Sequence, residues 1–588
     1  MKKSKFIKGL SATLGLTFVF GAVGCGGHTV DPGQEGGGSS DKTVIEVMNF
    51  GGGVGRKWLD QAVKRFETAY ATKSYETDKT GVEIKIENNI NTGAANMASS
   101  GIHIYFDQAS TINTWIQQGL MLDITDVVTE VTQDTRNGVA TSIEGKIDEN
   151  LRYQYKGNDG NYYALPHYEF YDGLTYDVEL FENEGFYFAA NPSEGTKYTC
   201  SLVGKDFYFV KSASTKKSCG NDGKFGTQDD GLPTTLEELI ALCDYMKEEA
   251  SVTPFVLAGN HNDYSTYVIN GLTAALAGYD QAQAMFSFTA NEVETVTGFS
   301  SDNLFPGFNG VKKPNTQRVA VTEETGYLAY NQVSKYYAYA FMQIAVERGW
   351  ISTNATQTTH LHTDAMRDLI LNGIGQKPKA GMIMEGSYWL NEAEDNDIFN
   401  EYLDFSTTEK KLGWMALPTS LNVPVTGESN AREMVMFNGA KTAAFINGNL
   451  ATKRNTEGII NACKDFLRFL YSDAELVEFV KQSGTMKAGM EIEIGNDILS
   501  QMTSGQKSMM EYRANNRVLQ QANNNPTLNN KFSVLTYGID RGHRPYINGV
   551  RYYSVVEAVR TGGATAQACF ESLDISESLW AQDYYKNN

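Results

Sequence analysis

Apolar side chains between residues 43 and 126 recur with two spacings, one typical of strands and one of helices. Residues 43–50 form an apolar run and residues 81–88 alternate apolar with polar positions, so both segments predict strands. A third strand is expected at 102–106, and residues 119–126 close that unit. Strand, helix and strand in this order predict a parallel sheet flanked by helices, and hence the α/β class. The helix between the first two strands is predicted by the spacing of Trp58, Leu59, Ala62, Val63, Phe66 and Tyr70.

The pattern becomes less regular after the first sheet. Extended segments at 162–166 and 174–176 predict that the chain there leaves the lobe built on this first sheet. Residues 186–231 are rich in Gly, Lys and Ser and have irregular periodicity, which indicates an insertion. A capping box, in which Thr235 and Glu238 satisfy the first backbone amides, opens the next helix. Later helices are expected at 457–471 and at about 553–573.

The first 42 residues have the composition of a targeting segment and a tether. Lysines precede an apolar run from Leu10 to Val23, and small residues then lead into Cys25. This order predicts a signal peptide over 1–24, too short to span a bilayer comfortably. It resembles a bacterial lipoprotein signal, in which Cys25 carries the lipid. The Gly- and Ser-rich residues 25–42 then form a flexible tether. We therefore expect lipid anchoring to the cell membrane on its extracellular face; the alternative is an ordinary secreted protein.

Length, charge and cysteine content limit the remaining possibilities. A chain of 588 residues exceeds one ordinary core, so two or more domains are expected. A net charge of −20 argues against binding nucleic acid or anionic lipid head groups. Cys200 and Cys219 bracket one polar loop and could form a disulfide. Cys243 and Cys463 occupy apolar helix positions and are expected to be small core residues.

Five segments, taken in order, carry a resemblance to a known family. They are residues 49–66 (a strand, NFGGG and a helix), 160–181 (with GNYYALP and GLTYD), 380–393 (AGMIMEGSYWLNEA), 413–418 (GWMALP) and 445–484. Together they resemble the maltose-binding-protein-like, family 1, extracellular solute-binding proteins of bacterial sugar ABC importers. The chain departs from the family pattern in its extra length and in the insertion at 186–231.

The resemblance implies an architecture and a function. The fold would be α/β, periplasmic-binding-protein-like of type II, with two Rossmann-like lobes joined by hinge crossovers near Pro166 and Pro418. Lobe 1 would comprise 43–165 plus 416–484, and lobe 2 would comprise 166–415 plus 485–588. Such a protein is a binding protein without enzymatic activity or cofactor. It would act as a monomer that captures a carbohydrate, an oligosaccharide being the expected guest, and delivers it to the membrane permease of an ABC importer.

Candidate ligand contacts follow from the chemistry of a sugar. Its C–H faces stack on aromatic rings, and its hydroxyls need carboxylates and amides. Trp389 stands where the family places a stacking aromatic. The loop containing Gly52 and Gly53 can present backbone amides next to a helix start. For every candidate the alternative is a structural role. The further candidates are Glu385 and Asn391 beside Trp389, Asp107 after a strand, Tyr168 and Glu169 in the crossover, and Asn260, Tyr264 and Tyr553.

Two alternatives remain open from sequence. An exported glycoside hydrolase would need two carboxylates ~5–9 Å apart, and Glu169 and Glu385 are the pair to consider. Asp222, Asp229 and Asp230 lie in a Gly-rich loop that resembles a calcium loop without its terminal acid. This loop predicts either a structural calcium site or a solvated turn.

Overall fold

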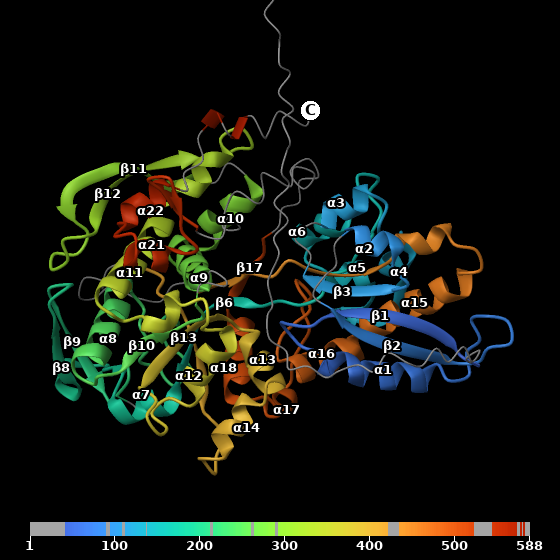
Figure 1. Ribbon diagram of the computed structural model, residues 1–588, viewed down its shortest axis with the longest axis horizontal. Coiled ribbons are helices and arrows are strands. Elements are labelled where there is room, and N and C mark those ends of the chain that lie inside the picture. The colour runs from blue at the N-terminus through green and yellow to red at the C-terminus, as the bar shows by residue number, and fades with distance from the viewer. Residues whose placement is uncertain are drawn as a thin grey trace, which may run out of the picture. The chain divides into compact units, whose positions relative to one another are not determined.

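Two mixed sheets with flanking helices organise the computed structural model (Figure 1). The predicted signal peptide, Cys25 and most of the tether lie outside the described residues, as does Asn260. Within the described residues, no helix combines the length and apolar content that crossing a bilayer requires. The structure describes residues 41–89, 94–108, 112–136, 138–211, 216–259, 264–288, 292–421, 434–521, 544–572, 577–578 and 580–581.

The first sheet has the strand order β16-β3-β1-β2. Its strands are β1 (Thr43–Phe50), β2 (Val82–Asn89), β3 (Ile104–Gln108) and β16 (Thr442–Ile446). β1 pairs in parallel with both β2 and β3, which confirms the predicted βαβ unit. β16 comes from far along the chain and pairs antiparallel with β3. The part of the protein built on this sheet is called the first half below.

Helices of the first half come from two distant stretches of sequence. α1 (Lys57–Ala69) buries Trp58, Leu59 and Phe66, as its spacing predicts. In Figure 1, α15 (Glu457–Leu470) lies beside β1, with which it is in contact. The other helices here are α2 (Ala94–Ser99), α3 (Ile112–Gln117), α4 (Thr125–Thr129), α5 (Ile143–Lys146), α6 (Glu149–Arg152) and α16 (Asp473–Ser483), with a small hairpin of β4 (Val131–Arg136) and β5 (Val139–Ser142).

The second sheet has the order β10-β13-β6-β15-β17, and β14 also pairs with β6. β6 is buried along its whole length and runs antiparallel to β13, β14 and β15. The sheet is therefore mixed, because the strand that enters it from the first half runs against its neighbours. Its strands are β6 (Tyr171–Asp177), β10 (Thr253–Val256), β13 (Ala380–Gly386), β14 (Leu412–Met415), β15 (Val435–Asn438) and β17 (Arg517–Leu519).

The second half, built on this sheet, is mainly helical. α8 begins at the predicted capping box of Thr235 and Glu238, which the structure confirms. Its helices are α7 (Val178–Glu184), α8 (Leu236–Glu248), α9 (Ser265–Ala277), α10 (Tyr279–Ser287), α11 (Val333–Glu347), α12 (His362–Ile370), α13 (Trp389–Asp395), α14 (Ile398–Leu403), α17 (Asn496–Leu499), α18 (Ser504–Asn515), α21 (Val555–Arg560) and α22 (Ala566–Glu571). Two ribbons complete it, β11 (Glu292–Asn303) with β12 (Lys312–Ala320) and β18 (Tyr546–Ile547) with β19 (Val550–Arg551).

The chain crosses between the two sheets at places that the sequence predicts only in part. Leu165 bridges to Ala444 of β16, and Tyr171 begins β6 of the second sheet, so the chain passes from one sheet to the other within residues 166–170. The return lies later than the predicted boundary at 416. Strand β15 still belongs to the second sheet, and the first sheet resumes only at Thr442. The segment between them is short, residues 439–441, and begins with the turn dipeptide Asn438-Gly439.

Two further predictions need correction. Residues 186–231 hold a three-stranded sheet in the order β7-β9-β8, whose aromatic side chains join the core of the second half. Its strands are β7 (Tyr187–Phe188), β8 (Thr196–Cys200) and β9 (Lys205–Val210). The helix predicted over 553–573 is two helices, because Gly563 has a φ of 63° and ends the first. Cys200 and Cys219 are both free thiols, whereas Cys243 and Cys463 are buried as expected.

Candidate functional site

The loop of residues 51–55 follows β1 and brings the first half against α13 of the second. The Asn49 side-chain amide donates to the carbonyl oxygen of Gly55 at 3.3 Å, which fixes the loop to the end of the strand. Gly53 has a φ of 67°, a conformation that glycine adopts without steric cost. Its N–H donates to Glu392 Oε1 at 2.9 Å. The predicted glycine loop thus presents an amide to a carboxylate from the other sheet.

Tyr168 lies directly beside this loop. A Cβ atom on Gly53 would overlap the Tyr168 hydroxyl, so only glycine allows this approach. The hydroxyl accepts a hydrogen bond of 2.5 Å from Gln108 Nε2 at the end of β3. Burial raises the pKa of Tyr168, and the charges of Glu392 and the buried Asp107 raise it further. The structure therefore gathers three of the predicted residues, Gly53, Asp107 and Tyr168.

A chain of hydroxyls continues from here into the second half. The hydroxyls of Tyr267, near the start of α9, and Tyr388, just before α13, are 2.8 Å apart. Tyr388 donates in turn to Glu385 Oε1 at 2.9 Å. The Phe170 ring meets the Tyr388 ring edge-on, with centroids 5.0 Å apart. We call this set of side chains the aromatic–carboxylate cluster; it comprises Tyr168, Phe170, Tyr264, Tyr267, Glu385, Tyr388 and Glu392.

The two carboxyl groups of the cluster are unusual in their protonation. Glu385 is fully buried, and burial followed by the charge of Glu392 raises its pKa well above the ordinary range. Burial raises the pKa of Glu392 to about 7, although the Gly53 N–H opposes that shift. Within the described residues, Glu385 Oε2 has no hydrogen-bond partner. The cluster thus holds a carboxyl group with unused hydrogen-bonding capacity.

Trp389 does not offer a stacking face in this structure. Its side chain is 0% exposed and packs in a core cluster with Leu369 and Ile383. The indole Nε1 donates to Thr175 Oγ1 at 3.1 Å, which anchors the start of α13 to β6. The predicted sugar platform is therefore a core residue here. The aromatic side chain that joins the cluster is its predecessor, Tyr388.

Glu169 is also a structural residue, contrary to the prediction. Its carboxylate accepts hydrogen bonds from Gly489 N, Gln520 Nε2, Tyr171 Oη and Arg513 Nε, at 2.5–3.0 Å. Although burial opposes ionisation, Arg513 leads the interactions that lower the pKa of Glu169. With four donors in place, this carboxylate has no capacity left for a ligand or for acid–base chemistry. The pairing of Glu169 with Glu385 in a glycoside hydrolase loses its basis for the same reason.

The remaining candidates are dispersed. The Asn391 amide donates to Ser483 O at 2.9 Å and accepts from Gln506 Nε2 at 3.3 Å, so it ties α13 to two other segments. The Tyr264 ring lies 5.5 Å from the Tyr267 ring and belongs to the cluster. Tyr553 is 51% exposed just before α21, and its described contacts lie outside the cluster.

The acidic loop does not form a calcium site. Asp222 N donates to Asp229 Oδ2 at 3.0 Å, and Gly226 N donates to Asp230 Oδ2 at 2.7 Å. The carboxylates are thus engaged by amides of their own loop. No group of three or more His, Cys, Asp or Glu side chains in the described part of the chain could hold a metal ion. These hydrogen bonds within the loop are those of a turn.

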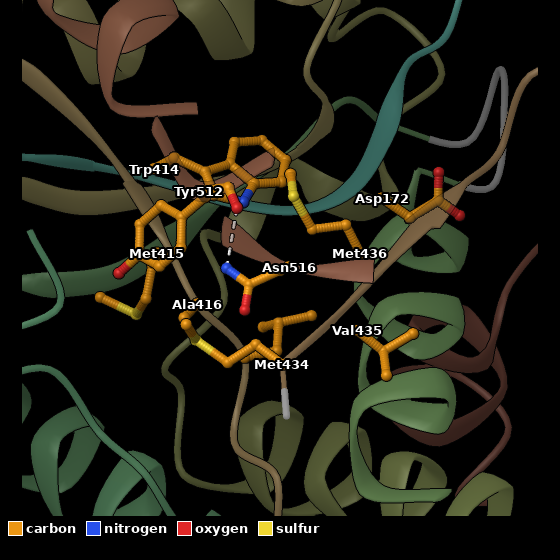
Figure 2. A pocket seen from close by; sticks show the side chains of 10 residues that line it. Asp172, Trp414, Met415, Ala416, Met434, Val435, Met436, Tyr512 and Asn516 are labelled. Atoms are coloured by element: carbon orange, nitrogen blue, oxygen red, sulfur yellow. Dashed lines mark hydrogen bonds between the residues drawn. The ribbon is translucent and has the colours of Figure 1, made fainter. Parts of the chain in front are cut away.

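A separate small cavity lies where β14 and β15 diverge from β6. Trp414, Tyr512, Met434 and Met436 are among its lining residues, and Asn516 donates to Tyr512 O at 2.8 Å (Figure 2). It encloses about 20 Å³. That is room for about one water molecule, far less than a sugar ring requires.

Sequence reasoning missed Phe170, Tyr267 and Tyr388. A usable signal was present for Tyr388. Strand β13 ends at Gly386 and α13 begins at Trp389, so the two adjacent aromatic residues at this junction point in different directions. Choosing the residue nearer the strand end would have identified Tyr388. Tyr267 carried no such signal, because it lies within a helix that is mostly buried.

Comparisons with known proteins define the fold. No protein-family model matches the sequence, and no curated protein matches it. Among solved structures, a binding protein of an ABC transporter from Bifidobacterium animalis subsp. lactis, in complex with mannobiose, superposes with a TM-score of 0.51 at 12% identity. The match covers 93% of this chain and 95% of that protein. A chitin oligosaccharide binding protein superposes with a TM-score of 0.50 at 12% identity, over 92% of this chain and all of its own. The chain thus has the mixed α/β fold of periplasmic solute-binding proteins, which confirms the predicted fold class.

Proposed function

We propose that this chain is the solute-binding component of an ABC importer, which captures an extracellular carbohydrate and delivers it to a membrane permease. The observation that carries the proposal is the aromatic–carboxylate cluster at the junction of the two sheets. Aromatic faces suit the C–H patches of a sugar, and the hydroxyls and carboxyls of the cluster suit its rim of hydroxyl groups. Both superposed proteins bind saccharides, mannobiose in one and chitin oligosaccharide in the other.

The contact between Gly53 and Glu392 supports a capture mechanism. It joins a loop of the first half to a helix of the second by one direct hydrogen bond. A saccharide bound to both elements would favour the arrangement in which they approach each other. A ligand shifts a conformational equilibrium only by its differential affinity for the two states. The proposed saccharide ligand therefore has to contact both halves of the protein.

A thermal unfolding screen of the purified protein against a panel of oligosaccharides tests this function. A ligand present at 100 times its Kd adds ~2.7 kcal/mol to the free energy of unfolding. Tyr388→Phe removes the hydroxyl that links Tyr267 to Glu385. We expect it to weaken binding about 10-fold, since each lost hydrogen bond contributes ~0.5–1.5 kcal/mol.

The matched control is Tyr553→Phe, which removes an exposed hydroxyl outside the cluster and should leave affinity unchanged. A panel without any stabilising saccharide would contradict the proposal. Steady conversion of a bound saccharide to products would favour the hydrolase alternative instead.

We also propose that Cys25 carries the lipid that anchors the protein outside the cell. The support is the sequence order of lysines, apolar run, small residues and Cys25. Two acyl chains hold a protein stably where one does not. In a bacterial host, the protein should fractionate with membranes, and Cys25→Ser should release it or block its processing. Membrane retention of a fully processed Cys25→Ser variant would contradict the anchor.

A further inference from the structure

The charges around the aromatic–carboxylate cluster have one dominant sign. Burial raises the pKa of the Tyr267 hydroxyl most, and the acidic groups Glu385, Asp172 and Glu392 raise it further. Glu385 and Glu392 act in the same way on Tyr388. The basic groups recorded nearby lie at the rim. Lys57 pairs with Glu394, a different residue of α13, at 2.8 Å, and His362 Nε2 is 4.0 Å from Glu392 Oε2.

Glu385 adds an independent observation. It is 0% exposed, and its Oε2 has no hydrogen-bond partner in the part of the chain that the structure describes. Burying a charge is costly unless it is paired, so the group retains its proton until a partner arrives. Its other oxygen is bonded to Tyr388, which places the unused oxygen within the cluster.

Aromatic rings complete the environment. Phe170 and Tyr267 have centroids 6.0 Å apart, and both rings meet Tyr388 edge-on. The negative face of an aromatic ring attracts a cation within ~6 Å of its centroid. A protonated amine supplies three hydrogen-bond donors and a positive charge. It can therefore pair with Glu385 and contact these rings at once, whereas a neutral hydroxyl offers no positive charge to either.

We infer that the saccharide taken by this cluster carries a protonated amine, which binds at the unpartnered oxygen of Glu385, beside Tyr388 and Tyr267. This inference rests on the proposed function and narrows its substrate class to amino sugars with a free amino group. On binding, the Glu385 carboxyl releases its proton to solvent and forms a charge-assisted hydrogen bond with the ammonium. Such bonds are roughly twice as strong as those between neutral partners.

Calorimetric titration with three disaccharides of equal linkage tests the inference: the β-1,4-linked glucosamine dimer, its N-acetylated form and cellobiose. We expect the free amine form to bind at least 10-fold more tightly than either neutral sugar. Glu385→Gln should abolish this preference, so that the free amine form binds no more tightly than cellobiose. Glu392→Gln is a second variant, with a smaller loss for the amine form, in case the first does not fold. Glu394→Gln removes an exposed carboxylate from the same helix and should change nothing.

Each outcome has a distinct meaning. Equal affinity for the three sugars, or preference for the N-acetylated form, overturns the inference and leaves the proposed function intact. The same holds if Glu385→Gln and Glu392→Gln, both folded, retain the preference for the amine. If no saccharide binds, including those of the wider panel, the proposed function fails and the inference fails with it.

Discussion

Glu169 and Glu385 are both fully buried carboxyl groups, yet their pKa values shift in opposite directions. Glu169 accepts four hydrogen bonds, one of them from the cationic Arg513, and its pKa is lowered. Glu385 accepts from the Tyr388 hydroxyl, and its pKa is raised by burial and then by the charge of another carboxylate, Glu392. Burial by itself favours the neutral form of both; the partners decide the outcome.

The comparison separates a structural carboxylate from a candidate binding one. Glu169 lies at the first crossover and bonds to Gly489 and to Gln520, so it holds together segments far apart in sequence. The hydrogen-bonding capacity of Glu169 is therefore used within the protein. Glu385 lies at the end of β13 with an oxygen still to satisfy. The sequence alone does not distinguish these two glutamates. The hydrogen-bond donors around each of them determine its role.

The largest expected effect comes from breaking the saturated site. Glu169→Gln replaces one of the two acceptor oxygens by an NH2 group. That group is itself a donor, so it would face donors that now bond to the carboxylate. It also leaves the 4% exposed Arg513 without its buried partner. Breaking a buried ion pair in this way costs about 3–5 kcal/mol. We expect a loss of this size in the free energy of unfolding, measured by urea titration.

The control for this prediction is Glu491→Gln. Glu491 pairs with the same guanidinium at 2.8 Å, but its side chain is 57% exposed. Exposed pairs contribute ~0–1 kcal/mol. Similar losses in both variants would show that burial does not distinguish the two partners of Arg513.

The next effect is a pH dependence of the free energy of unfolding that arises from Glu392. Its folded-state pKa is about 7 against an ordinary value of 4.5. Between these values the folded protein binds a proton that the unfolded chain has lost, so the free energy of unfolding falls as pH rises from about 4.5 to 7. At ~1.36 kcal/mol per pKa unit, the difference between these two values corresponds to about 3 kcal/mol over the full range. Glu392→Gln should remove it.

Stability at pH 5 and pH 8, measured by chemical denaturation of both proteins, checks this sign. Other groups titrate in both proteins, so the informative quantity is the difference between them. The wild-type protein should lose about 2–3 kcal/mol more than Glu392→Gln over this range. A variant that loses as much as the wild type would contradict the assignment.

The sequence predicts elements better where their signal is local. The unit β1–α1–β2 follows from alternating and helical spacing, and the helix start at Thr235 follows from a capping box. The return crossover is missed because β15 and β16 are both short and fully buried, so no polar positions mark which sheet each joins. Which side chains face a site depends on such strand pairings, and these join segments that are far apart in the sequence.

The candidate site shows the same limit. Gly53 and Gln108, at the end of β3, both approach Tyr168, because strand ends converge in an α/β fold. Glu169 and Trp389 are chosen for their residue type, but their environments are built by Arg513 and Thr175, more than two hundred residues away. Residue type identifies chemistry that is available, and tertiary contacts determine whether it is already used.

A smaller effect distinguishes Trp389 from its neighbour Tyr388. Trp389→Phe loses the hydrogen bond to Thr175 and leaves a small space in the core. We expect about 1–2 kcal/mol of destabilisation, from the lost hydrogen bond and the lost packing. Saccharide affinity should stay within two-fold, whereas Tyr388→Phe should weaken it. An affinity loss of 10-fold at unchanged stability would instead restore Trp389 as the stacking residue.

Glu385→Gln should change the free energy of unfolding least of all these substitutions. It is the most direct comparison with Glu169→Gln. The raised pKa favours the neutral form of Glu385, so the substitution exchanges one neutral group for another of nearly equal size. Glutamine retains an oxygen that can accept from Tyr388, and its amide takes the place of a group that already lacks a partner. We therefore expect a change below about 1 kcal/mol in urea unfolding, since no buried charge is created or left unpaired. The same substitution at Glu169 serves as the matched comparison at the same pH. A loss of several kcal/mol at Glu385 would mean that this carboxyl is ionised and paired inside the folded protein, and would remove its capacity for an external cation.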